Sequence, residues 1–284
     1  MNFTIPKLPL AHGIDIALDW LTVHIAFITK AFSHVISILI DALVHALLWL
    51  PPWLLIVVVA LLAWRVSGWK VALGSLLGLL LLWNLRLWPA TVETFTLVLI
   101  STLIAVAIGL PLGIAAALST RTSRVVMPVL DFMQTMPAFV YLIPAIPFFG
   151  LGAVSASVAT VIFATPPTIR LTALGIRQVP KDLIEAADAF GSTRRQKLFK
   201  VQLPMAVPTI MAGVNQTIML SLSMVVIAAM IGAGGLGGVV WRAIQRLEPG
   251  QGFEAGIAIV ILAMILDRIT QRIGRSPSAK EAGR

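Results

Sequence analysis

Few residues of this chain have the types and spacing that chemistry requires. His24, His34 and His45 lie ten and eleven residues apart, whereas a helical metal site needs histidines three or four residues apart. The chain has no cysteine, which excludes thiolate metal sites and disulfides. It also lacks the GxxxxGK[S/T], HExxH and GxSxG motifs of nucleotide hydrolases, zinc proteases and serine hydrolases. We therefore predict no enzyme activity, no catalytic residue, no cofactor and no metal in this chain.

The residues that could instead bind another molecule cluster in EAADAFGSTRRQKLFKVQLP, residues 185–204. Asp182, three residues before Glu185, predicts a capping box at the start of a first helix. Gly191 predicts the end of that helix, because glycine readily adopts the left-handed conformation that closes a helix. Thr193, followed three residues later by glutamine, predicts a capping box at the start of a second helix. The segment is therefore predicted to fold as a helix, a glycine turn and a second helix.

The predicted helix pair also carries an apolar stripe, which a merely solvated loop would not need. The stripe is formed by Leu183, Ile184, Ala187 and Phe190. Leu203-Pro204 is expected to end the second helix, because proline has no N–H to donate. These agreeing signals indicate a folded surface element that another protein binds. The alternative that stays open is that its Arg and Lys residues serve only to fix membrane topology.

The composition places these residues in a membrane protein. Hydrophobic residues make up 58% of the 284 residues, charged residues make up only 12%, and the mean hydropathy is +0.96. A soluble domain has about 25% charged residues. A helix needs about 20 apolar residues to cross a bilayer. On that basis we predict an all-α polytopic membrane protein with five clear spans, at about 92–119, 126–149, 153–172, 207–232 and 252–267.

The distribution of basic residues predicts the orientation of these spans. The chain has 21 Lys and Arg residues and a net charge of +9. With an external N-terminus, only five of them fall on the outer side: Lys7, Lys30, Arg86, Arg242 and Arg246. Because loops rich in Lys and Arg remain in the cytoplasm, residues 173–206 and the basic C-terminal tail, residues 269–284, are expected to be cytoplasmic. The same rule accounts for the net charge without a nucleic-acid partner, and we expect none.

The first 90 residues are expected to form two further parts. Polar residues recur every three or four positions along 14–48, which predicts an amphipathic helix. Residues 1–50 are therefore predicted to form an external region that lies at the outer boundary between water and bilayer. Residues 51–90 are predicted to contain two N-terminal transmembrane helices, near 50–64 and 70–88.

A glycine-rich stretch, GAGGLGG at 232–238, follows the fourth clear span. It is not a phosphate-binding loop, because no strand precedes it and no Lys-Ser/Thr pair follows it. We expect close helix packing or a hinge there. Trp241 to Arg246 are predicted to form a short outer helix, which is a suitable place for an external protein to bind.

The segment at 185–204 resembles the loop shared by permease subunits of type I ABC importers. Glu185-Ala-Ala, Gly191 and Val201-x-Leu203-Pro204 occur at the family's spacing, with valine where the consensus has isoleucine. In that family the loop forms the coupling helix that docks in a cleft of the ATP-hydrolysing subunit. The resemblance also implies a five-helix permease core over residues 91–268. It assigns the interface with the ATP-hydrolysing subunit to Glu185, Ala186, Ala187, Asp188, Gly191, Arg194 and Arg195.

Four further motifs, within about 85–275, resemble the glycine betaine/proline betaine permeases. They are LDFMQTMPAFVYLIP, PPTIRLT, MAVPTIMAGVNQ and SMVVIAAMIGAGGLG. The resemblance implies ATP-driven import of glycine betaine, proline betaine or a related quaternary amine such as choline, across a bacterial inner membrane. It also implies a homodimer, partner ATP-binding subunits that carry ATP and Mg²⁺, and an external substrate-binding protein. The N-terminal region is similar to the external scaffold element of that branch.

The second clear span holds the candidates for the translocation path. An ionisable residue is costly in lipid, so Asp131 is expected either to line the path or to pair with Arg121 or Arg124. Prolines break a helix, and broken backbone is tolerated where it faces protein or a watery cavity. Aromatic faces attract quaternary ammonium groups, although a single aromatic in a span more often serves packing. The candidates are Asp131, Gln134, Pro137, Phe139, Tyr141 and Pro144.

Two other functions stay open. One is a type I permease for a different small solute, such as an amino acid. The other is a secondary transporter driven by an ion gradient, which requires paired charges near the centre of the membrane and an inverted repeat. The sequence offers only Asp131 and Glu254, both near span ends, and no repeat. The secondary transporter is therefore the less favoured of the two.

Overall fold

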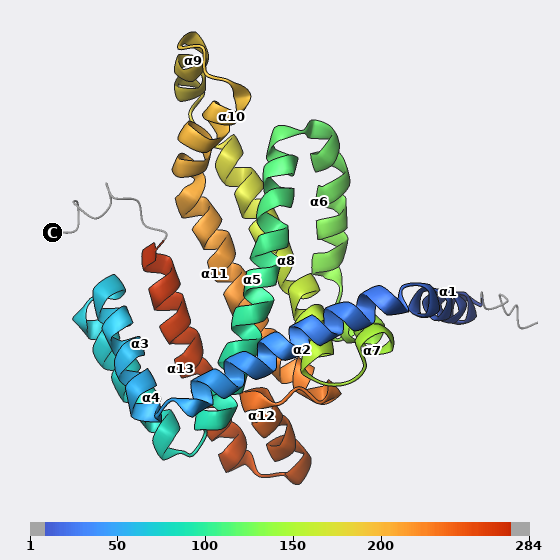
Figure 1. Ribbon diagram of the computed structural model, residues 1–284, viewed down its shortest axis with the longest axis vertical. Helices are drawn as coiled ribbons and strands as arrows, with labels where there is room; N and C mark the ends of the chain where they lie inside the picture. The colour runs from blue at the N-terminus through green and yellow to red at the C-terminus, as the bar shows by residue number, and fades with distance from the viewer. Residues whose placement is uncertain (1–8, 274–284) are drawn as a thin grey trace, which may run out of the picture.

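The computed structural model describes residues 9–273, and every regular element in this part of the chain is a helix (Figure 1). The part of the predicted basic tail that follows Ile273 lies outside the described residues. The helices are α1 (Leu10–His24), α2 (Ala26–Trp49), α3 (Pro52–Ser67), α4 (Trp69–Asn84), α5 (Trp88–Leu118), α6 (Thr120–Thr135), α7 (Leu142–Phe149), α8 (Ala153–Arg177), α9 (Lys181–Ala189), α10 (Arg194–Lys197), α11 (Leu203–Ala228), α12 (Gly235–Arg246) and α13 (Pro249–Ile273). Short 3-10 turns at Ala138–Tyr141 and Ala229–Ile231 and a π-helical segment at Leu198–Gln202 join some of them.

Four helical stretches of the described chain are long and apolar enough to cross a membrane. They are α2, α5, α8 and the continuous run Arg194–Ile231, which includes α11. The bent pair formed by α6 and Ala138–Phe149 raises the number to five if it counts as one span. The helices predicted at 92–119, 153–172 and 207–232 are thereby confirmed as candidate spans. The span predicted at 252–267 lies within the 25-residue helix α13, which is not among these stretches, so the helix is confirmed and its crossing of the membrane stays a prediction.

The span predicted at 126–149 is not one helix. α6 and the segment Ala138–Phe149 meet at an angle of 112°. The break is at Met136, whose ψ of 133° is extended, because a residue that precedes a proline is pushed away from the helical conformation. The hydroxyl of Tyr141 donates a hydrogen bond back to the carbonyl of Met133 and thereby holds the bend closed.

The centre of the molecule is the contact of α5, α8 and α11, where small side chains let the backbones approach closely. A Cβ at Gly113 would lie 2.6 Å from the Cβ of Thr172. Hydroxyl pairs link the same helices, with 3.0 Å between the Oγ atoms of Ser101 and Ser157 and 2.7 Å between the Oγ1 atoms of Thr168 and Thr217. Small residues and hydroxyls are what helix packing inside a bilayer uses, because lipid supplies little hydrophobic drive for helix association.

The N-terminal helices α1 and α2 run in a different direction from the helices of this bundle (Figure 1). In Figure 1, α2 runs across α5 rather than along it, and α1 lies beyond it, next to α7. Ile36 and Ile40 of α2 are buried against Ile100 of α5. The helical prediction for 14–48 is confirmed except for a break at Ile25. The composition of α2 would allow a span, but its direction agrees with the predicted position along a membrane surface.

α3 and α4 form a hairpin on the flank of α13. Gly68, with a φ of +92°, makes the turn between them. Each helix has 16 residues and is therefore about 24 Å long, which is shorter than the roughly 30 Å hydrocarbon layer. Two helices were expected here and two are present, but their length alone does not confirm that both cross the bilayer.

The central contact yields a stability prediction. Gly113→Ala places a methyl group against Thr172, and overpacking of this kind costs about 1–3 kcal/mol. Gly74→Ala, in α4, is the matched control because nothing lies within 4 Å of the added Cβ. We expect Gly113→Ala to lower the melting temperature of the detergent-solubilised protein and Gly74→Ala to leave it unchanged or raise it. Equal effects of the two substitutions would contradict the account of this contact.

Candidate functional site

The segment predicted to bind another protein is a helix pair that projects from one end of the molecule (Figure 1). Its first helix, α9, begins at Lys181, directly after Pro180. The prediction that Asp182 caps this helix is therefore wrong, and no side-chain cap is present. Pro180, whose extended ψ of 134° precedes the first helical turn, begins the helix earlier. Asp182 lies inside the first turn, where a carboxylate interacts favourably with the helix dipole.

The glycine turn predicted at Gly191 is confirmed, and its geometry is a Schellman motif. Gly191 has a φ of +71°. Its N–H donates to the carbonyl of Asp188 at 2.9 Å, and the N–H of Ser192 donates to the carbonyl of Ala187 at 3.0 Å. Both bonds satisfy carbonyls that the end of α9 would otherwise leave free. The turn thus fixes the direction in which the chain leaves α9.

The second helix of the pair begins with the predicted capping box. The N–H of Gln196 donates to the Oγ1 of Thr193 at 3.3 Å, and the N–H of Thr193 donates to the Oε1 of Gln196 at 2.8 Å. An ion pair between Asp188 and Lys197 ties α9 to α10. The two helices of the pair are therefore held in one fixed arrangement.

The predicted stop at Leu203-Pro204 is wrong, because the helix continues into the bundle. The π-helical segment Leu198–Gln202 joins α10 to α11. In this segment the N–H of Leu203 donates to the carbonyl of Leu198, five residues earlier. Pro204 lies at the start of α11, directly after the π-helical segment, and has no N–H to donate to the preceding turn. The projecting pair is thus continuous with a helix of the central contact.

The projecting pair exposes the residues that the sequence singled out. Glu185, Ala186, Asp188, Gly191, Arg194 and Arg195 are exposed, and Ala187 is half-buried. The apolar stripe is also uncovered: Leu183 is 42% exposed and Phe190 is 90% exposed. Leu183 and Phe190 therefore leave apolar area of the projecting pair uncovered, outside the spanning helices.

The candidates for the translocation path divide into two groups. Tyr141 is buried and packs edge-on against Phe163 of α8, so it holds the α6–α7 bend in place. Gln134, Pro137, Phe139 and Pro144 are exposed on the surface of this bent segment. Four of the candidates are therefore exposed on this segment, and the fifth, Tyr141, is turned into the core.

The sixth candidate, Asp131, is paired with a residue that the sequence reasoning did not select. Its carboxylate forms an ion pair with Arg170 of α8, and the expected partners Arg121 and Arg124 were wrong. Both side chains remain partly exposed, so the pair lies at the edge of the bundle. Arg170 could have been selected from the sequence, because it is a charged residue that follows Pro166-Pro167 within an apolar helix.

Glu93 is a second residue that the sequence reasoning missed. It lies in α5, where its Oε2 accepts a hydrogen bond of 2.6 Å from the N–H of Gly235. Neighbouring Thr94 accepts one of 2.8 Å from the N–H of Leu236. α12 consequently begins at Gly235, inside the glycine-rich stretch and earlier than the predicted Trp241. The close packing expected of that stretch is confirmed.

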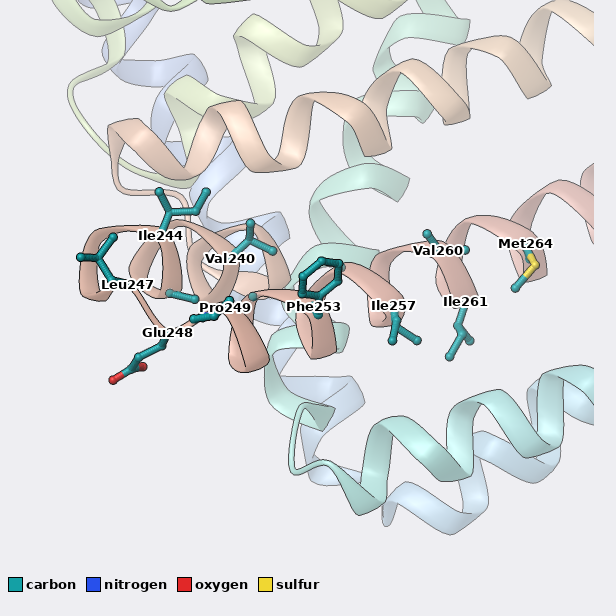
Figure 2. Close-up of a pocket in the computed structure, with 13 residues that line it drawn as sticks. Val240, Ile244, Leu247, Glu248, Pro249, Phe253, Ile257, Val260, Ile261 and Met264 are labelled. Carbon is teal, nitrogen blue, oxygen red and sulfur yellow. The ribbon is translucent and has the colours of Figure 1, made fainter.

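A large groove between α12 and α13 is lined almost entirely by apolar side chains (Figure 2). Its volume is about 960 Å³, and Glu248 is the one charged residue in its lining. Phe253, Ile257 and Met264 follow one exposed face of α13 along it. Such a face is what lipid or another apolar helix contacts, and it offers a small polar solute almost no hydrogen-bonding groups.

Comparison with known proteins fits this geometry. The sequence profile of the family described as "Binding-protein-dependent transport system inner membrane component" matches residues 109–276. The fold is similar to that of a crystal structure of the MetNI methionine ABC transporter in an inward-facing conformation, with a TM-score of 0.62 and 24% identity. That similarity covers 66% of this chain and 94% of the other.

The bundle and its projecting helix pair define an all-helical, multi-span membrane component of an ABC transporter. The chain belongs to the family of binding-protein-dependent transport system inner membrane components. It is 52% identical to the glycine betaine transport system permease protein OpuAB of Bacillus subtilis, over 95% of both chains. It is 53% identical to the glycine betaine/carnitine permease GbuB of Listeria monocytogenes, over 97% of this chain and 99% of that one. It is 48% identical to the glycine betaine/proline betaine permease ProW of Escherichia coli, over 96% of this chain and 77% of that one.

The α6–α7 bend yields a prediction of its own. Tyr141→Phe removes the hydroxyl that bonds to Met133 and leaves a carbonyl without this partner, at a cost of about 0.5–1.5 kcal/mol. Phe139→Leu, a few residues away and exposed, is the control. We expect a lower melting temperature in detergent for Tyr141→Phe alone. An unchanged value would show that the bend does not depend on this bond.

Proposed function

We propose that this chain is the permease subunit of a bacterial ABC importer for glycine betaine, proline betaine or a related quaternary amine. The observation that carries the proposal is an identity of 48–53%, over nearly the whole chain, to permeases named for glycine betaine transport. Membership of a binding-protein-dependent family favours an ATP-driven importer over a secondary transporter. The likeness to a methionine transporter concerns the fold and does not favour an amino acid as the substrate.

The family assigns ATP hydrolysis to another subunit, so the task of this chain is to convert that hydrolysis into movement. We propose that the projecting pair α9–α10 is the coupling helix that docks in the ATP-binding subunit, which carries ATP and Mg²⁺. Glu185, Arg194 and Arg195 supply charge at that interface, and the exposed stripe around Phe190 supplies apolar area. Because Arg194–Ile231 is one continuous helical run, displacement of the pair moves α11 as well.

Movement of α11 would reach the rest of the bundle through the central contact. α11 is bonded to α8 through Thr217 and Thr168, and its Ser221 accepts a hydrogen bond from Thr102 of α5. We propose a homodimer in which the two copies switch between inward- and outward-facing arrangements as the partner subunits close on ATP. Switching of packed helices between two arrangements is the usual basis of such transitions.

The proposed topology follows from the positions of the two ends of the bundle. α9 and α12 lie at opposite ends of the molecule (Figure 1). With α9 in the cytoplasm, α12 faces the outside, where an external substrate-binding protein would dock. The N-terminus is then external and the C-terminus cytoplasmic. In this arrangement α1 and α2 form the external scaffold, and α3–α4 and the central bundle contact lipid.

The proposed path runs along the open face of the α6–α7 segment. Phe139 is 52% exposed there, next to the bend at Pro137. An aromatic face attracts a quaternary ammonium group by a cation–π interaction. Selectivity among betaines would come mainly from the external binding protein, and this face would have to let a compact methylated ammonium pass.

The stripe on α9 generates a testable prediction. Phe190→Ala is expected to reduce co-purification of the ATP-binding subunit and ATP-dependent uptake by about tenfold or more, because truncation of a buried aromatic at an interface costs about 2 kcal/mol. Phe253→Ala, in the groove between α12 and α13, removes another highly exposed phenylalanine and serves as the control. Retention of assembly and uptake by Phe190→Ala would refute the assignment of the coupling helix.

The substrate class is tested by reconstitution of the permease with its ATP-binding and substrate-binding subunits in liposomes. We expect ATP-dependent uptake of radiolabelled glycine betaine that excess proline betaine or choline reduces and excess methionine does not. Uptake of an amino acid in place of any quaternary amine would overturn the substrate assignment while leaving the importer class intact.

A further inference from the structure

Two neighbouring side chains of α5 hold the start of α12. The N–H of Gly235 donates to Glu93 and the N–H of Leu236 donates to Thr94, across 142 positions of sequence. The first N–H groups of a helix have no partner within that helix. A cap normally comes from the residue just before the helix. Here a different transmembrane helix supplies it, so α12 is bonded at its origin to α5.

The glycine-rich stretch is fitted to this contact. A Cβ at Gly234 would lie 2.5 Å from the Oε2 of Glu93, and a Cβ at Gly235 would lie 2.5 Å from the Oγ1 of Thr94. Gly235 also has a φ of +71°, which residues with a Cβ adopt only at a cost. Leu236, directly after it, is fully buried. The absence of side chains at two successive positions lets both acceptors reach the backbone.

The position of Glu93 is otherwise unexplained. A carboxylate within an apolar helix is costly unless it is paired or bonded. Within residues 9–273, the ion pairs of the structure do not include Glu93. It borders a cavity of about 170 Å³ together with Asp41 of α2, which is also acidic. The N–H of Gly235 is therefore the group that accounts for a carboxylate at this point.

The opposite end of α5 is bonded to the chain that leads into α9. Arg177, the last residue of α8, donates a hydrogen bond of 2.5 Å to the carbonyl of Ala116 in the last turn of α5. α9 begins four residues later, at Lys181. α5 has 31 residues and is therefore about 46 Å long. One helix thus connects the start of α12 with the approach to the projecting pair.

We propose that Glu93 and Thr94 are positioning residues that make α12 move with α5, so that docking of the binding protein at α12 changes the ATPase rate on the other side. This inference rests on the proposed function. The two bonds give α12 a fixed position relative to α5. Without them, α12 is still tethered by the chain, but its displacement need not move α5.

The test compares ATP hydrolysis by the reconstituted complex with and without the substrate-loaded binding protein. Glu93→Leu and Thr94→Val each remove an acceptor, whereas Glu93→Gln and Thr94→Ser each keep one. We expect the stimulation by the binding protein to fall about tenfold in Glu93→Leu and about threefold in Thr94→Val, in line with the loss of a charged and of a neutral hydrogen bond. Basal hydrolysis, measured without the binding protein, should stay within about twofold of wild type, because the lost hydrogen bond holds α12 and not the projecting pair.

Controls separate coupling from folding. Glu93→Gln and Thr94→Ser should restore stimulation, and Asp41→Asn should retain it, because Asp41 borders the same cavity but makes no bond to α12. Full stimulation in both Glu93→Leu and Thr94→Val overturns the inference. Parallel loss of basal and stimulated hydrolysis also overturns it, because that pattern indicates a structural role alone. Absence of stimulation in the wild-type complex would instead count against the proposed function.

Discussion

The structure depends on the close contact of α5, α8 and α11. Inside a bilayer the backbone must satisfy its own hydrogen bonds, and helices associate through packing and polar contacts rather than through exclusion of water. Glycines such as Gly109 and Gly113 face Thr168 and Thr172 at distances that leave no room for a Cβ. The same surfaces place hydroxyls in pairs between helices. The contact is therefore both tight and specific, so a movement of one helix would displace the other two.

Both ends of the molecule are connected directly to these three helices. α8 leads into α9, and α10 continues through a π-helical segment into α11. Each helix of the projecting pair is therefore connected to a helix of the central contact. At the other end, α5 caps α12 through Glu93 and Thr94. The projecting pair is held together by the Schellman turn at Gly191 and the capping box at Thr193. Two ends joined by a tight centre are what the proposed transmission of movement across the membrane requires.

The sequence predicted those features that depend on local chemistry. Hydropathy located the long helices, Gly191 and Thr193 marked the turn and the cap, and the motif at 185–204 led to the family. Local signals failed where two of them competed. α9 starts directly after Pro180, so that Asp182 lies inside the helix and not at its cap. The helix also continues past Pro204, because a π-helical segment precedes this proline. Contacts between distant residues could not be predicted, because the partners of Asp131 and Glu93 lie 39 and 142 positions away and are set by how helices pack. The bend at Pro137 was expected as a kink, but neither its 112° angle nor the bond from Tyr141 back to Met133 could be predicted from local sequence.

The central claim is that the projecting pair and the outer end of the bundle move together. Because the chain has no cysteine, single spin labels can be placed at Lys181 in α9 or at Gln245 in α12, both of which are exposed. Distances between the two copies in the assembled complex can then be measured with and without ATP, with hydrolysis blocked. The account predicts that ATP shortens the distance between the Lys181 labels and, in the same step, lengthens the distance between the Gln245 labels. A shorter Lys181 distance with an unchanged Gln245 distance would contradict it, because the two ends would then move independently.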